Sequence, residues 1–255
     1  MKLKAMYKPG KQGPLRPYET LAVMEEGFEL VAYKKWVGKV IACSNPKEYE
    51  ERDELRPKQR HEQMISIRLA KILVNIVAKP KDVLLDPFCG YGILLQEAML
   101  LGHDVIGVDN NPQCVNASKI NLDWTRNKYR LNSSIKVING DSTMLSNFVK
   151  KADCIATEPH LGPILKKLPT KEVALKTVKQ LERLYSQVLK EFSKVANGRI
   201  AIIMPRFRLH TNERISMGFL KLLRESGLKP ISKDIPIIYS APKSRMDREI
   251  WVISR

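Results

Sequence analysis

The sequence lacks the cysteine pattern of a structural metal site or a disulfide framework. Its four cysteines are scattered and form no Cys-x-x-Cys pair, the spacing typical of zinc ribbons and redox motifs. No second histidine or cysteine stands near His160 at metal-ligand spacing, so we expect no metal ion. These absences argue against a fold stabilised by structural zinc or by disulfide bonds. They leave a domain stabilised by its hydrophobic core.

Long apolar runs are also absent. None approaches the ~20 residues that a membrane-spanning helix needs. The segment from Met1 to Gln12 carries lysines but no apolar stretch, which is unlike a secretory signal. We therefore expect no membrane contact and a cytoplasmic location.

Acidic residues are scarce. The chain has 27 Asp and Glu against 44 Lys and Arg, a formal net charge of +17, and no basic block dominates. Lys and Arg that neutralise phosphates release condensed counterions, so the excess favours nucleic acid as a partner. A generally basic soluble protein without such a partner is the alternative reading.

The pattern of apolar residues divides the chain. Residues 1–60 read as an arm, a β-hairpin with strands at 28–34 and 37–42, and a charged linker. Residues 61–255 begin with an amphipathic helix at 65–78 and then alternate short apolar runs with helical patterns, which is typical of a parallel sheet. Expected strands are 83–85, 104–108, 135–138, 154–156 and 199–204. Expected helices are 93–101, 113–126, 171–195 and 215–226. Strands at 231–239 and 249–253 should close the sheet as an antiparallel pair.

A glycine-containing loop follows the first expected strand of the sheet. It reads Asp-Pro-Phe-Cys-Gly-Tyr-Gly over residues 86–92. Ligands of open α/β sheets bind where strands run into such loops, and glycine lets the backbone approach a ligand without a Cβ clash. A dinucleotide fingerprint needs a third glycine where this chain has Gln96. The loop therefore indicates a cofactor without a pyrophosphate.

Acidic residues end the next strands as well. Asp109 is placed to accept both ribose hydroxyls of an adenosine, Asp141 to accept from an adenine amino group, and Asp86 to hold the ammonium of a methionine moiety. Together they predict an S-adenosylmethionine site. Its expected residues are Asp86, Phe88, Gly90, Gly92, Asp109, Asn110, Asp141 and Ser142.

The loop sequence resembles the signature of methyltransferases that act on amino groups in nucleic acid. The chain is similar to archaeal and eukaryotic tRNA guanosine-N2 methyltransferases, a THUMP-linked group that modifies nucleotide 10. The similarity runs from about residue 28 to residue 255 and is strongest over 52–162, with support from the segments at 49–53, 56–57, 66–70 and 73–75. The resemblance implies a Rossmann-like, seven-stranded methyltransferase sheet with a final antiparallel hairpin. It also implies a small N-terminal β-hairpin, an S-adenosylmethionine cofactor and a tRNA substrate.

One departure concerns RNA capture. Members of the group carry a THUMP domain before the catalytic domain, and the segment before residue 28 is too short to hold one. Either the basic arm and a partner take over substrate capture, or the THUMP domain is a separate polypeptide. Some relatives also use a small zinc-containing activator.

A second departure concerns the catalytic motif. Where the family has Asp/Asn-Pro-Pro-Tyr/Phe-Gly, this chain has Glu158, Pro159, His160, Leu161 and Gly162. An exocyclic amine is a poor nucleophile because its lone pair is delocalised, and two acceptors on its N–H groups localise that pair. By resemblance, Glu158 and the carbonyl of Pro159 are the acceptors. His160 or Leu161 replaces the aromatic packing, although His160 also suits a plain turn.

We therefore expect methylation of the N2 amino group of guanosine in tRNA. Two alternatives stay open: a DNA adenine or cytosine amino-methyltransferase, for which no target-recognition domain fits, and a catalytically weak cofactor-binding subunit that binds or scaffolds RNA. A C5-pyrimidine methyltransferase is disfavoured because the chain has no Pro-Cys dipeptide. Basic residues near the expected active-site rim are predicted to contact RNA phosphates, namely Arg56, Arg60, Arg206, Arg208, Lys243 and Arg245.

Overall fold

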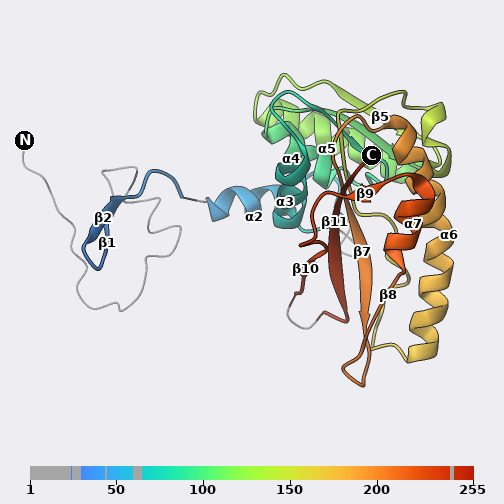
Figure 1. Cartoon of the computed structure of the whole chain (residues 1–255). Helices are drawn as coiled ribbons and strands as arrows, with labels where there is room; N and C mark the ends of the chain where they lie inside the picture. The colour runs from blue at the N-terminus through green and yellow to red at the C-terminus, as the bar shows by residue number, and fades with distance from the viewer. Residues whose placement is uncertain (1–23, 25–29, 44, 60–64, 242–243) are drawn as a thin grey trace, which may run out of the picture. The chain divides into compact units, whose positions relative to one another are not determined.

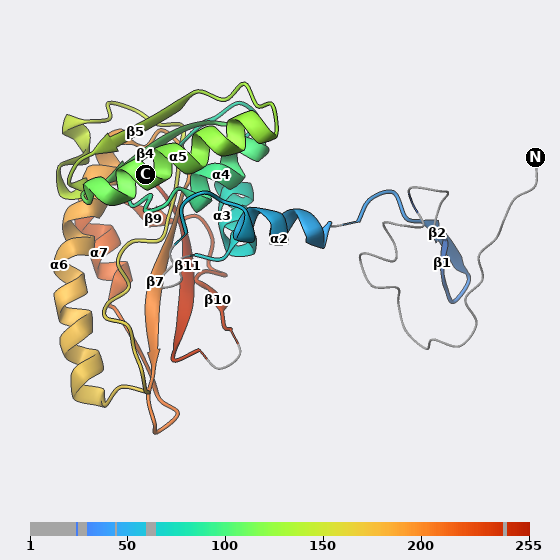
Figure 2. The same cartoon turned by 180° about the vertical axis from the view of Figure 1, so that it is seen from behind.

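The computed structural model describes residues 24, 30–43, 45–59, 65–241 and 244–255 (Figure 1; Figure 2). The chain divides into two compact units, residues 1–55 and 56–255. We describe each unit by itself.

The first unit contains a β-hairpin and a helix. Strands β1 (Leu30–Tyr33) and β2 (Trp36–Lys39) pair antiparallel, with Leu30 opposite Lys39. The predicted hairpin is therefore confirmed with shorter strands, and its expected start at residue 28 lies outside the described residues. Helix α2 (Pro46–Glu54) begins at Asn45, whose side chain accepts from the backbone of Lys47. The charged linker expected here is thus partly helical.

The second unit is built on one mixed sheet, which confirms the expected Rossmann-like fold. Along its main path the strand order is β10-β11-β7-β6-β3-β4-β5, with β8 paired to β7 and β9 to β11. Neighbours from β7 to β5 are parallel, while β11 runs antiparallel to β7 and β10 antiparallel to β11. The strands are β3 (Val83–Asp86), β4 (Asp104–Asp109), β5 (Ile135–Asn139), β6 (Cys154–Thr157), β7 (Ile200–Arg208), β8 (Arg214–Ser216), β9 (Lys229–Pro230), β10 (Ile237–Tyr239) and β11 (Met246–Ser254).

Helices cover both faces of this sheet (Figure 1; Figure 2). One layer holds α3 (Ile67–Val77), α4 (Ile93–Leu100) and α5 (Pro112–Lys128), and the other holds η1 (Ser142–Asn147), α6 (Lys171–Val195) and α7 (Phe219–Ser226). Helix α6 has the bounds that the sequence predicts, because the side chain of Thr170 caps its first turn. In the part of the chain that the structure describes, no helix is both long and apolar enough to cross a membrane.

Two expectations near the C-terminus are wrong. The helix expected from residue 215 begins only at Phe219, because Ile215 pairs with Phe207 in the short strand β8. The strand expected over 231–239 is confined to Ile237–Tyr239. A proline at position 236 supplies no amide N–H for an earlier ladder bond.

Tyr185 ties α6 to the sheet. Its side chain is fully buried, and its hydroxyl lies 3.3 Å from the carbonyl oxygen of Ile203 on β7 and 3.2 Å from that of His160 after β6. Burial raises the pKa of this phenol well above its usual value, so the hydroxyl stays a donor. The hydroxyl has one proton, which it shares between two carbonyl oxygens that are shielded from water.

We predict that Tyr185→Phe lowers the free energy of unfolding by about 0.5–1.5 kcal/mol, because a buried carbonyl loses its donor. Urea denaturation followed by circular dichroism measures the change. Tyr239→Phe is the matched control, since no hydrogen bond of that hydroxyl is found among the described residues. Equal stability of the two variants would contradict the assignment.

Candidate active site

A cavity of about 730 Å³ opens at the carboxyl edge of the parallel strands. Its walls are the loop after β3, the end of β4, the start of η1, the loop after β6 and the start of β11. Because parallel strands end at one edge, residues far apart in sequence meet here. The predicted site residues that line it are Phe88, Gly90, Asp109, Asn110, Asp141, Ser142, Glu158, Pro159, His160 and Arg245.

The glycine loop shapes one wall. Gly90 lines the cavity with φ +49°, and a Cβ at this position would meet no protein atom within 4 Å. A side chain would therefore project into open space that a ligand can use. Gly92, with φ +83°, is the N-cap of α4, and a Cβ there would lie 2.7 Å from the hydroxyl of Ser118. Gly92 lines neither described cavity, so its part is to form the turn.

Asp109 ends β4 and holds two loops. One carboxylate oxygen accepts from the backbone N–H of Gly90 and the other from that of Asn111, both at 2.9 Å. A carboxylate oxygen offers more than one acceptor direction. Both oxygens therefore keep capacity for hydroxyl groups in the cavity.

Asp141 and Ser142 stand where η1 begins. One oxygen of Asp141 accepts from the backbone and hydroxyl of Thr143, both at 2.8 Å, and its other oxygen has no recorded partner among the described residues. The hydroxyl of Ser142 donates to the carbonyl of Pro87. Asp141 thus has a free acceptor, while Ser142 holds the two loops together.

Asp86 lies in a smaller cavity of about 100 Å³, which Glu158 also lines. The carboxylate accepts from the hydroxyl of Thr157 at 2.7 Å and from the backbone of Phe88 at 3.0 Å. Burial raises the pKa of Asp86 to about 7, despite these two hydrogen bonds. Its charge therefore changes within the physiological pH range.

Glu158 is paired with a residue that the sequence analysis missed. Arg248 on β11 donates through Nε to Oε1 of Glu158 at 2.6 Å. Burial raises the pKa of Glu158, and Arg248 opposes the rise. A signal was available: Met-Asp-Arg-Glu opens an otherwise apolar strand, and charged side chains that enter a sheet need partners.

His160 lies on the same loop with an exposed side chain, and its carbonyl accepts from Tyr185. The backbone of the loop after β6 is thus held to α6. Cys89 is buried in the glycine loop, and burial raises the pKa of its thiol well above its usual value. A neutral thiol there fills space in the loop.

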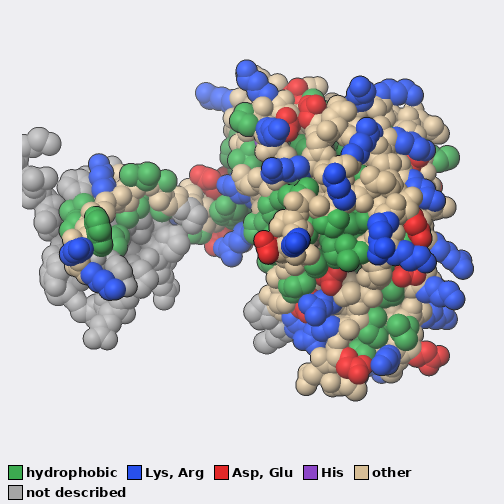
Figure 3. All heavy atoms as spheres, viewed as in Figure 1, with side chains coloured by type: hydrophobic (Ala, Val, Ile, Leu, Met, Phe, Trp, Pro, Cys, Tyr) green, Lys and Arg blue, Asp and Glu red, His purple; other side chains and the backbone are tan. Residues whose placement is uncertain are grey.

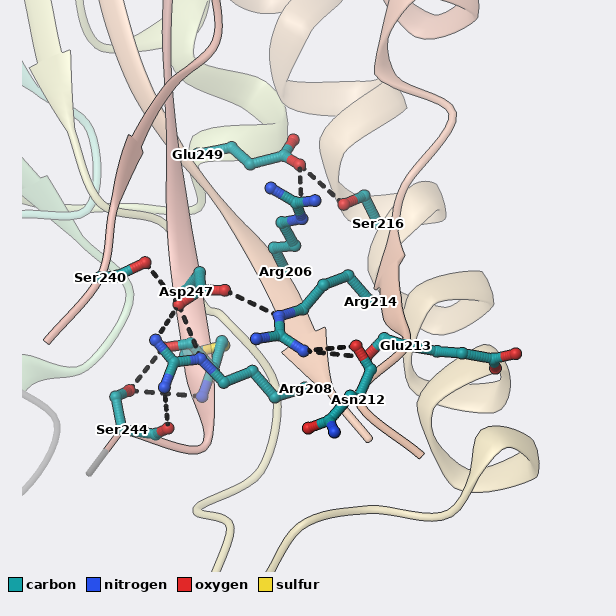
Figure 4. Close-up of polar contacts among 11 residues, drawn as sticks. Arg206, Arg208, Asn212, Glu213, Arg214, Ser216, Ser240, Ser244, Asp247 and Glu249 are labelled. Atoms are coloured by element: carbon teal, nitrogen blue, oxygen red, sulfur yellow. Dashed lines mark hydrogen bonds and ion pairs between the residues drawn. The ribbon is translucent and has the colours of Figure 1, made fainter. Parts of the chain in front are cut away.

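The predicted RNA-contacting arginines differ in their surroundings (Figure 4). Arg208 donates to Asp247 and, at 3.0 Å, to the carbonyl of Ser244, while Arg214 reaches the second oxygen of Asp247 at 3.2 Å. Arg206 lies 4.0 Å from Glu249. These contacts join the strands β7, β8 and β11 to one another.

The other predicted RNA contacts are more scattered. Arg245 is exposed and lines the cavity. Arg56 is 2% exposed and donates to the carbonyl of Lys58 at 3.3 Å, so it is placed to order its own segment. Positions 60 and 243, where Arg60 and Lys243 were predicted, lie outside the described residues. Across the visible face of the second unit, Lys and Arg side chains are spread widely and outnumber acidic ones (Figure 3).

Comparison with known proteins gives a family match over the same region. Residues 55–217 match the model of the family described as "RMKL-like, methyltransferase domain". The chain is 31% identical over 176 residues to a "tRNA (guanine(10)-N2)-dimethyltransferase" of Pyrococcus abyssi, covering 68% of this chain and 48% of that protein. It is 36% identical over 102 residues to a protein of the same name from Methanocaldococcus jannaschii, covering 37% of this chain and 28% of that protein.

The chain therefore spans about half the length of the first of these relatives, and less of the second. Among solved structures, it resembles TrmN from Thermus thermophilus with a TM-score of 0.55 and 19% identity, covering 86% of this chain and 56% of that one. At this identity the likeness concerns the fold.

The buried carboxyl group of Asp86 generates a pH prediction. Because its pKa rises from 3.8 to about 7 on folding, its contribution to stability is full below pH 3.8 and is lost as pH rises to about 7. Asp86→Asn keeps the hydrogen-bond acceptor and removes the titration. Relative to the wild type, we expect the variant to gain stability from pH 4 to pH 7, by up to about 4 kcal/mol, and to change little above.

Chemical denaturation at several pH values measures this difference. Asp123→Asn, an exposed carboxylate paired with Arg126 on α5, is the control and should follow the wild-type profile. Parallel profiles for the wild type and Asp86→Asn would refute the raised pKa.

Proposed function

Because the chain belongs to the family of RMKL-like methyltransferase domains, we propose that it is an S-adenosylmethionine-dependent enzyme that methylates the N2 amino group of guanosine in tRNA. The observation that carries the proposal is the larger cavity at the carboxyl edge. It unites the acidic ends of β4 and β5 with Glu158 and Pro159 after β6. A cofactor wall and an amine-accepting loop thus face one space.

The described residues fit the cofactor. Asp109 would accept the ribose hydroxyls, Asp141 would accept from the adenine amino group through its free oxygen, and Asp86 would face the ammonium. Gly90 leaves open space against the loop, where a Cβ would otherwise project. When bound, S-adenosylmethionine supplies a methyl group on a sulfonium sulfur, which leaves as a neutral thioether.

Glu158 and Pro159 would prepare the target amine. A carboxylate oxygen of Glu158 accepts one N–H and the carbonyl of Pro159 accepts the other, which localises the nitrogen lone pair. Holding both reactants in one cavity removes much of the entropic cost of bringing them together. After the nitrogen–carbon bond forms, the surplus proton leaves the nitrogen by way of Glu158.

The choice of tRNA guanosine rests on two supports. The curated relatives are named tRNA (guanine(10)-N2)-dimethyltransferases, and the net charge of +17 suits a polyanionic substrate. We further propose that a THUMP-bearing partner or a small zinc-containing activator takes part in RNA capture, as the resemblance to THUMP-linked enzymes suggests.

Methyl transfer from labelled S-adenosylmethionine to unmodified bulk tRNA tests the proposal, with the products identified as nucleosides by mass spectrometry. We expect N2-methylated guanosine, lost in Glu158→Ala. Glu225→Ala, which removes an exposed carboxylate on α7, is the matched control and should retain activity. A different methylated base would refute the substrate. No product from a cofactor-binding enzyme, with or without cell extract, would refute catalysis and favour a binding subunit.

The exposure of Arg245 at the cavity gives a second prediction. Exposed Arg245 should contact a phosphate, so Arg245→Ala should weaken tRNA binding and reduce the slope of log K against log salt by about 1. Arg224→Ala, an exposed arginine on α7, is the control and should leave the slope unchanged. Filter binding at several salt concentrations measures both. An equal effect of the two variants would show only a diffuse charge effect.

A further inference from the structure

The ion pair between Arg248 and Glu158 lies inside the cavity rather than on the outer surface. It joins β11 to the loop after β6, and both residues line the cavity. The side chains are 21% and 12% exposed. A mostly buried pair of charges is costly to desolvate and by itself adds little stability, so its position in the cavity calls for a functional reason.

Arg248 stands apart from the arginine network on the same strand. Successive side chains of a strand point to opposite faces, and Asp247 and Glu249 on either side turn toward Arg206, Arg208 and Arg214 (Figure 4). Arg248 faces the cavity instead. Of its guanidinium, only Nε has a recorded hydrogen bond within the described residues.

The pair therefore offers both acceptors and donors to the cavity that it lines. Oε1 of Glu158 is bound by Arg248, and Oε2 has no recorded partner among the described residues. The terminal nitrogens of the Arg248 guanidinium only donate, and none has a hydrogen bond within the described residues. Together the pair can supply two acceptors from Glu158 and a donor from Arg248.

Guanine presents the complementary set of two donors and one acceptor. Its Watson–Crick edge carries two donors, N2–H and N1–H, followed by the acceptor O6. Adenine and cytosine place a ring nitrogen lone pair next to their amino group, and that lone pair would face a carboxylate oxygen. Enzymes that act on an extruded base read it through this edge. The groups of Glu158 and Arg248 thus favour guanine over the other bases that have an amino group.

We propose that Arg248 and Glu158 together select guanine, with Glu158 accepting from N1–H and N2–H and Arg248 donating to O6. Arg248 would then be a specificity residue that touches the substrate, in addition to being the ion-pair partner of Glu158. The selection deepens the proposed function and rests on it. Planar guanidinium and carboxylate groups suit such paired contacts better than an ammonium would.

The test replaces one substrate atom. An unmodified tRNA transcript pool is prepared with part of its guanosine replaced by 6-thioguanosine, which keeps N1–H and N2–H but has a weakly accepting sulfur at position 6. Mass spectrometry then compares N2-methylation of the two nucleosides, corrected for their incorporation. Because both compete in one reaction, the ratio does not depend on how much variant enzyme is folded.

The wild type should prefer guanosine by about 10- to 100-fold, the discrimination expected of one paired base contact. Arg248→Met should reduce this preference to about threefold or less, because no donor remains to distinguish oxygen from sulfur. Arg214→Met, which removes a partly buried arginine paired with Asp247 on the other face, is the matched control and should keep the wild-type ratio. If Arg248→Met yields too little product, Arg248→Lys is measured instead, and its preference should fall below that of the wild type.

Three results would overturn the proposal, and they are distinguishable. An unchanged preference in the Arg248 variants would show that Arg248 acts only on Glu158. A wild type without preference would show that O6 is not read. Absence of N2-methylguanosine from the wild-type reaction would refute the proposed function itself and the guanine selection with it.

Discussion

The parallel strands of this sheet end at one edge, where several carboxylate groups therefore lie close together. The chemistry of the site follows from the proximity of these carboxylates. Asp86 ends β3, Asp109 ends β4 and Glu158 follows β6. Burial is the first cause of the raised pKa of Asp86, and the neighbouring carboxylates Asp109 and Glu158 add to it. Arg248 supplies a compensating positive charge to one of these groups. A cationic ligand in the cavity would relieve the same repulsion, which matches the sulfonium and ammonium charges of the proposed cofactor.

The C-terminal strands form the second support of the site. β11 pairs along β7 from Ile253 opposite Ile200 to Met246 opposite Phe207, so its first residues reach the carboxyl edge although it runs the other way. On one face Asp247 gathers Arg208, Arg214 and Ser240. Hydrogen bonds from Arg208 and Ser240 outweigh burial and lower the pKa of Asp247. That charged cluster fixes the strand that presents Arg248 on its other face.

Much of the fold and part of the site could be predicted from the sequence, because both depend on local patterns. Alternating runs predicted the parallel strands, a helical pattern predicted α6, and the strand ends located Asp109 and Asp141. Pairings across long distances could not be predicted. Ile215 belongs to a strand only because Phe207 lies opposite it, and Arg248 meets Glu158 across 90 positions. The raised pKa of Asp86 depends on burial, which no spacing of residues reveals.

The alternation along β11 has a consequence for how this protein can vary in length. Inserting or deleting one residue within Met246–Ser254 would exchange the two faces of the strand. Arg248 would turn toward the charged cluster, and a carboxylate would turn toward the cavity. The charged cluster around Asp247 and the pairing of Arg248 with Glu158 would both be lost through one insertion or deletion. Insertions and deletions should therefore be excluded from this strand.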